Sequence, residues 1–163
     1  MKKKRKIVGS IILAIIFIST FSFYLTSTQT KQLKTIYEKS LVKIFENISG
    51  SSNTLEYIAI DLDTLKGLDD TEKKEVIIYF EEKYKLPIID ASYTDLLETG
   101  MEKRNKELSG ILLYVEKIEN HIININVHVA KEYGSSGGNG ITVKFRYKNG
   151  EWIIWNVKHN WIS

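Results

Sequence analysis

Side chains able to do chemistry are few in this sequence and lie far apart along it. Asp61 and Asp63 form an Asp-x-Asp pair, and one of these carboxylates near His128 could make a small acid–base site. His121, His128 and His159 lack the spacing of zinc ligands, and the chain has no cysteine to complete such a set. No Gly-x-Ser-x-Gly elbow marks a nucleophile. We therefore predict no catalytic residue, no metal site and no cofactor.

Residues 57–65, Tyr-Ile-Ala-Ile-Asp-Leu-Asp-Thr-Leu, resemble the strand-end signature of haloacid-dehalogenase-type phosphatases. The resemblance implies that Asp61 is a nucleophile and Asp63 an acid or base. The glycine that this family carries between the second aspartate and the threonine is missing here. A chain of 163 residues that ends in antiparallel strands also has no room for the parallel core of that family. We favour a strand that runs into an acidic, solvated turn.

Two further stretches suggest ligand binding but have simpler structural explanations. The glycine-rich residues 134–140 join two predicted strands, whereas a phosphate-binding loop opens a helix, so we expect a flexible hairpin loop. The aromatic side chains of Tyr147, Trp152, Trp155 and Trp161 could stack on a ligand. Tryptophans in strands more often pack in the core, and we expect Trp161 to be the most exposed of the three.

The N-terminal segment predicts export. Five cations at residues 2–6 precede an uncharged apolar run from Ile7 to about Leu25, which is long enough to cross a bilayer as a helix. Cations stay on the cytoplasmic side, so we expect a single-pass anchor with the N-terminus inside and the rest outside. The alternative is a signal peptide cleaved near Thr28 and a secreted protein. We predict a stub and membrane helix at 1–28 and one extracytoplasmic domain at 29–163.

The charge of that domain argues against nucleic-acid binding. The net charge of +3 includes the five N-terminal cations, and residues after 30 carry 18 Lys and Arg against 20 Asp and Glu. A nearly neutral domain lacks the basic footprint that phosphate backbones require. The expected partners are the membrane, crossed by the single span, and a protein or another envelope component.

Apolar spacing predicts three helices and at least five strands in the exported part. An amphipathic helix starts after Thr30 and runs to about Ile48, a second follows the capping pair Asp69 and Glu72, and a short third follows Ser92. Strands are expected at 55–62, 110–118, 121–131, 141–148 and 151–161, with a short extended piece at 86–90 marked as an edge by Pro87. Residues 55–62 and 86–90 could instead form a parallel pair.

The last two strands have a predicted register. Asn149-Gly150 favours a two-residue hairpin that pairs Tyr147 with Trp152 and Phe145 with Ile154. The same register would place Lys144 opposite Trp155 and Arg146 opposite Ile153 on the other face. In the strand at 121–131, Ile123 to Val129 alternate apolar and polar side chains. We predict an α+β fold with helices on one face of a mostly antiparallel sheet that ends in a four-strand meander.

This layout and the ending Lys-Asn-Gly-Glu-Trp-Ile-Ile-Trp at 148–155 resemble NTF2-like or cystatin-like domains of N-terminally anchored extracytoplasmic proteins in Gram-positive bacteria. The resemblance implies a cone-shaped sheet that can hold a pocket, and it transfers no catalytic residue. Two functions are therefore expected. The first is a non-catalytic, membrane-anchored module that binds a protein or envelope partner. The alternative is an exported small-ligand-binding or hydrolytic domain that uses a sheet pocket.

Overall fold

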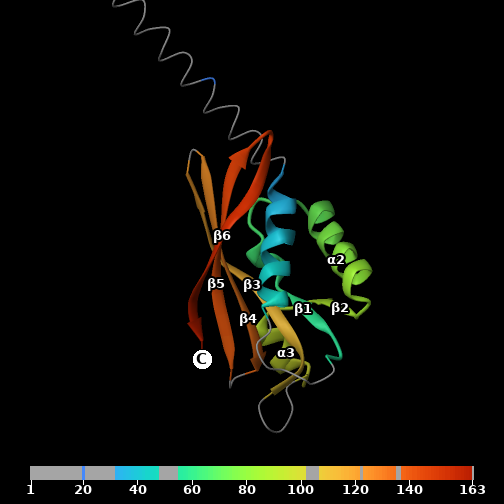
Figure 1. The fold of residues 1–163 in the computed structure, drawn as a ribbon. Helices are drawn as coiled ribbons and strands as arrows, with labels where there is room; N and C mark the ends of the chain where they lie inside the picture. Colours follow the sequence, from blue (N-terminus) through green and yellow to red (C-terminus); the bar gives the residue numbers. More distant parts are fainter. Residues whose placement is uncertain are drawn as a thin grey trace, which may run out of the picture.

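A computed structural model describes residues Thr20, 32–47, 55–101, 107–121, 123–134 and 137–162 (Figure 1). Residues 32–46 are helical, and the later elements are β1 (Ile58–Ile60), η1 (Leu62–Thr64), α2 (Asp70–Tyr84), β2 (Ile88–Asp90), α3 (Tyr93–Glu98), β3 (Glu107–Asn120), β4 (Asn124–Gly134), β5 (Gly138–Lys148) and β6 (Glu151–Ile162). The predicted α+β class is confirmed. Except for Thr20, the predicted anchor and cleavage site lie outside the described residues. Within the described part, no helix is long and apolar enough to span a membrane.

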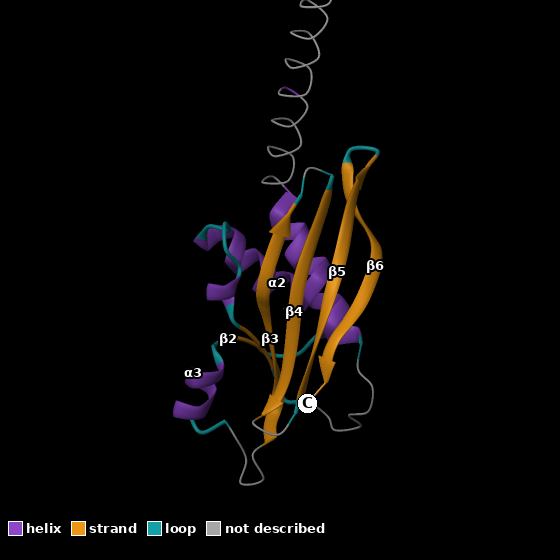
Figure 2. Ribbon diagram, turned by 90° about the vertical axis from the view of Figure 1, so that its left-hand side faces the viewer, coloured by secondary structure: helices purple, strands orange, loops and turns teal. Residues whose placement is uncertain are grey.

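The described strands form one six-stranded sheet in the order β2-β1-β3-β4-β5-β6. Strands β3 to β6 pair antiparallel with their sequence neighbours, which confirms the C-terminal meander (Figure 2). Strand β1 pairs parallel with both β2 and β3. The extended pieces at 58–60 and 88–90 thus form the parallel pair that the sequence left open, and β2 is an edge strand, as Pro87 suggested.

One face of the sheet packs against the helix at 32–46 and against α2 (Figure 1). Apolar residues at three- and four-residue spacing put Ile36, Tyr37, Leu41 and Ile44 on one side of the first helix, and each is at most 1 % exposed. They contact the alternate residues of β3, β4 and β5 that point the same way. Full burial of such a side chain stabilises the fold by about 1.5–3 kcal/mol. This layer is a filled core.

The short helix α3 lies on the opposite face, so the prediction that all helices share one face is wrong. Successive side chains of a strand point to opposite faces, and Tyr57 and Ala59 pack with Leu96 of α3, whereas Ile58 and Ile60 face the first core. Residues around a parallel strand that is buried on both sides are apolar on both faces. The run from Tyr57 to Ile60 is apolar at every position. Because apolar and polar residues do not alternate there, the sequence does not indicate which face of the strand a helix covers.

Local capping signals place the starts of α2 and α3 as predicted, whereas α3 ends at Glu98 and not at Met101, and the first strand is shorter than predicted. Asp69 and Glu72 form a capping box at the start of α2, and Ser92 forms another with Asp95 at α3. Strand β1 ends at Ile60 because the carboxylate of Asp61 accepts a hydrogen bond from the Asp63 amide and starts η1. The predicted strand therefore stops two residues early.

The β5–β6 hairpin has the predicted turn and most of the predicted register. Asn149 and Gly150 both have positive φ, and Tyr147 pairs with Trp152 across the sheet. A β-bulge follows, so Lys144 pairs with Asn156 and not with Trp155, which is the extra residue. Ile123 is also outside its predicted alternation, since β4 starts one residue later and leaves Ile123 51 % exposed.

The side chain of Gln32 joins the first helix to this hairpin. Its Nε2 donates to the Gly150 carbonyl at 3.1 Å, and its Oε1 accepts from the Trp152 amide at 3.3 Å. Strand β6 pairs with β5 on one side and is the edge of the sheet on the other. At this free edge, the side-chain amide of Gln32 makes the hydrogen bonds that a neighbouring strand would otherwise make. Contacts of this kind and β-bulges both protect an edge strand from pairing with another chain.

Candidate functional site

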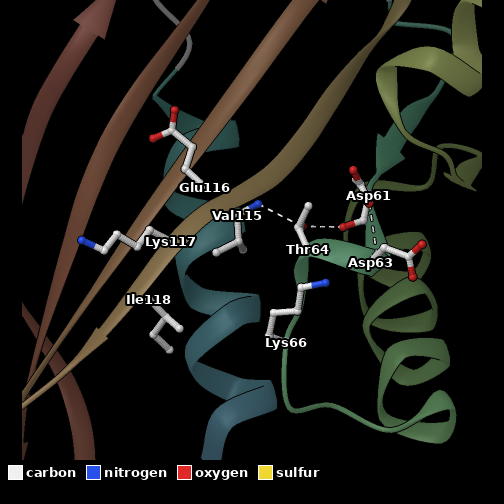
Figure 3. Close-up of a pocket in the computed structure, with 8 residues that line it drawn as sticks. All are labelled: Asp61, Asp63, Thr64, Lys66, Val115, Glu116, Lys117 and Ile118. Carbon is white, nitrogen blue, oxygen red and sulfur yellow. Dashed lines mark hydrogen bonds between the residues drawn. The ribbon is translucent and has the colours of Figure 1, made fainter.

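A cleft of about 350 Å³ opens at the carboxyl end of β1, where the Asp-x-Asp pair lies (Figure 3). Thr64 joins its two sides, because its Oγ1 donates to the Asp61 carbonyl at 2.6 Å and accepts from the Val115 amide at 3.1 Å. The cleft is lined by Asp61, Asp63, Thr64, Lys66, Val115, Glu116, Lys117 and Ile118. The carboxyl ends of parallel strands are common ligand sites, so this cleft is a candidate site for a small ligand.

The electrostatics of the cleft centre on Asp61. Burial raises the pKa of its carboxyl, and the nearby carboxylates of Asp63 and Asp90 add to the rise, while hydrogen bonds from the backbone oppose it. Asp63 is exposed and pairs with Lys73 at 3.3 Å. In Figure 3, Glu116 and Lys117 extend from β3 on the side away from the aspartates, so the charged side chains do not converge on one point.

His128 lies away from the aspartates, in a hydrogen-bonded row across the other face of the sheet. Its Nδ1 is 3.1 Å from the Thr142 hydroxyl, which donates to Asn160 Oδ1 at 2.8 Å, and its Nε2 is 3.6 Å from Glu119. The ammonium of Lys117 and the amide of Asn126 lower the pKa of the Glu119 carboxyl to about 2. Thr142, at the centre of the row, is only 5 % exposed, whereas the side chains of His128 and Glu119 are 26 % and 31 % exposed.

The other two histidines are in different places. His121 is exposed at the β3–β4 turn, and His159 Nε2 lies 3.4 Å from the Asn47 amide on the helix side. Within the described residues, no three His, Asp or Glu side chains are grouped so that they could hold a metal ion. The structure brings none of the sequence candidates together as a catalytic set.

The glycine-rich segment serves a tryptophan, a role that the sequence analysis missed. Gly138 and Gly140 lie inside β5, and a Cβ on Gly140 would be 2.4 Å from Nε1 of Trp161. The indole occupies this space and donates to Glu116 Oε1 at 3.1 Å. Trp161 is therefore partly buried, and the prediction that it is the most exposed tryptophan is wrong. Trp155 is 46 % exposed, and Trp152 is 2 % exposed.

The face of β5 and β6 away from the helix at 32–46 and α2 carries a group of cations around exposed apolar side chains. We call it the outer basic surface, made of Lys144, Arg146, Lys148, Ile153, Trp155 and Lys158. The guanidinium of Arg146 lies 4.7 Å from the Trp155 ring centroid, and Lys144 Nζ lies 5.9 Å from it. Among the described residues, none of the four cations is ion-paired with a carboxylate. The nearly neutral net charge of the domain does not reveal this local excess of positive charge.

A buried lysine is a second feature that sequence reasoning passed over. Lys131 is 0 % exposed, and its Nζ donates to the Asn47 carbonyl at 2.8 Å, just after the helix at 32–46. The position is favourable for a cation, since a helix C-terminus is partially negative. Burial nevertheless lowers the pKa of Lys131 to about 8. The inward-facing positions of β4 alternate along the strand, and Lys131 follows Val129 in this series. The alternation in the sequence could therefore have predicted that Lys131 is buried.

Comparison with known proteins adds no class to this geometry. Neither a protein-family model, nor a curated protein, nor a solved structure matches the chain. The likeness to NTF2-like domains therefore stays a resemblance.

Proposed function

We propose that this chain is a non-catalytic, membrane-anchored module whose extracytoplasmic domain binds a component of the cell envelope. The observation that carries the proposal is the outer basic surface, where exposed Ile153 and Trp155 lie among cations that form no ion pair with a carboxylate in the described part of the chain. Exposed aromatic and arginine side chains are typical of binding surfaces. The layer between the sheet and the first helix is filled, which favours binding at the surface over binding inside the sheet.

The anchor is the first part of the proposal to test. The apolar run from Ile7 to Leu25 and the cations before it support a single span with the domain outside. Alkaline carbonate extraction of membranes, with N-terminal sequencing of the recovered protein, distinguishes the two fates. A membrane-retained chain that keeps Lys2 to Lys6 is the expected result. A soluble chain that begins near Gln29 would overturn the anchor and support secretion after cleavage.

The binding surface can be tested by site-specific photo-crosslinking in cells that express the full chain. A benzophenone amino acid at Trp155 should capture an envelope component. The same probe at Ile78 of α2, which is 51 % exposed but on the helix side, is the matched control. Equal capture from both positions, or capture from Ile78 alone, would contradict the choice of surface.

A second candidate function rests on the cleft beside β1. Its volume of about 350 Å³ suits a small polar ligand, and burial raises the pKa of the Asp61 carboxyl, which could then donate a hydrogen bond or a proton. This is the exported ligand-binding or hydrolytic alternative. Asp61→Asn keeps the side-chain shape, so loss of binding of a captured metabolite in that variant would favour the cleft.

A further inference from the structure

We infer that the outer basic surface lies against the outer leaflet of the membrane and binds the phosphate headgroups of anionic lipids. This inference rests on the proposed function, since it names the envelope component that the surface contacts. It is carried by three observations on the described residues: the charge of the surface, its exposed apolar side chains, and the attachment of its hairpin to the start of the domain.

The charge is concentrated on one side of two strands. Lys144, Arg146 and Lys148 alternate with residues of β5 that pack in the core, so all three point away from the helix at 32–46 and α2. Lys158 is paired opposite Thr142 on the same face. Glu151 is the one acidic residue of β5 and β6. From Lys148 to Lys158, which lies opposite Thr142, the cations extend over six residues of strand, or about 20 Å at ~3.3 Å per residue. Such a broad array matches an extended anionic surface better than a single acidic side chain.

The apolar part of the surface has the composition of a membrane interface. Trp155 and Ile153 are 46 % and 37 % exposed, and Ile123, which is 51 % exposed, lies at the neighbouring β3–β4 turn. The two turns are joined, because the Tyr147 amide donates to the Ile123 carbonyl. Tryptophan is enriched at headgroup depth, and Lys and Arg can keep their charged ends among the headgroups while their stems cover apolar surface. The stacking of Arg146 on Trp155 presents both kinds of group together.

The β5–β6 hairpin is attached to a residue that lies close in sequence to the predicted anchor. Gln32 binds the turn of the hairpin through Gly150 and Trp152. Gln32 is only seven positions after Leu25, the end of the apolar run, and seven steps along the chain span at most about 25 Å. The turn therefore lies within about that distance of the predicted bilayer, and a tether this short gives a high effective concentration.

The test uses the full chain reconstituted into lipid vesicles and takes advantage of the absence of cysteine. Ile153→Cys carries an environment-sensitive dye, and Ile78→Cys carries the same dye as the control on α2. We expect the dye at 153 to shift to the blue in vesicles of phosphatidylcholine with phosphatidylglycerol, and to shift less in phosphatidylcholine alone. The dye at 78 should report water in both.

Charge variants test the cause of the shift. Replacing Lys144, Arg146 and Lys148 with glutamine should lower the docked-to-free ratio about 100-fold, roughly fivefold per cation. Lys39, Lys43 and Lys74 are exposed on the helix side and form no ion pair within the described part of the chain. Replacing these three with glutamine changes the net charge equally and should leave docking intact.

Each outcome decides the inference. Equal dye signals at 153 and 78, or equal loss in the two triple variants, would overturn it. A shift seen only in native membranes, and not in lipid vesicles, would place a protein on the surface and also overturn it. Alkaline carbonate extraction tests the anchor separately. If the chain proves to be released, the released protein is added to the same vesicles. A blue shift of the dye at 153 would then support lipid binding, and no shift would overturn it.

Discussion

Lys131 gives the sharpest test of the fold, because it is fully buried and its one described hydrogen bond is to a neutral carbonyl. Burial lowers its pKa from 10.5 to about 8. The folded state therefore binds this proton more weakly than the unfolded state does. Between about pH 8 and about pH 10.5 the unfolded chain holds more protons, so the free energy of unfolding should rise with pH in this window.

The magnitude follows from the two pKa values. At ~1.4 kcal/mol per pH unit, the difference corresponds to at most roughly 3 kcal/mol of destabilisation at pH 7. Lys131→Met keeps an unbranched side chain that is one atom shorter, and it removes the charge. It also removes the hydrogen bond to Asn47, at a cost of about 1 kcal/mol. We expect the variant to be more stable than the parent by about 1–2 kcal/mol at pH 7, and less stable by about 1 kcal/mol near pH 10.5.

The assay is urea unfolding of the full chain and of Lys131→Met in the same detergent, from pH 7 to pH 10.5. The difference between the two proteins isolates Lys131, because Tyr37, whose pKa burial raises to about 12, is common to both. Parallel stability curves across this range would refute the reasoning. So would an NMR titration in which the Lys131 side chain changes charge at its ordinary value.

Three further changes test other contacts. Gly140→Val should push the indole of Trp161 off β5, expose its fluorescence to water and cost about 1–3 kcal/mol in urea unfolding; an unchanged emission spectrum would show that the ring does not need that space. Asp69→Ala should cost about 1 kcal/mol through the lost cap of α2, measured in the same way, and no loss would contradict the capping box. Gln32→Ala should speed amide exchange at Trp152, and unchanged protection there would show that another group binds this amide.

Local chemistry accounts for what the sequence predicted well. The turn at Asn149-Gly150 needs two residues of positive φ and so determines the pairs beside it, including Tyr147 with Trp152. The capping box at Asp69 likewise depends on groups three residues apart. Such signals need no knowledge of the rest of the chain, and the α+β class with its final antiparallel strands follows from them and from the alternation of apolar residues.

Contacts between distant residues account for what the sequence did not predict. The bulge at Trp155 changes the register beyond the turn, and nothing adjacent to it in sequence announces the change. The exposure of Trp161 depends on glycines in another strand, and the face chosen by α3 depends on the parallel pairing of β1. The outer basic surface could be inferred only once the register showed which cations share a face. The anchor at 7–25 stays a prediction.

The bond between Gln32 and the last hairpin also bears on the order in which the chain can fold. Its partners are separated by 118 and 120 positions, so the helix at 32–46 is joined to residues that are synthesised more than a hundred positions later. Contacts of this sequence separation make folding slow, since a long loop must close before they form. Until β6 is in place, the hydrogen bonds of Gln32 to Gly150 and Trp152 cannot form, so the attachment of the helix at 32–46 to the sheet is completed late in folding.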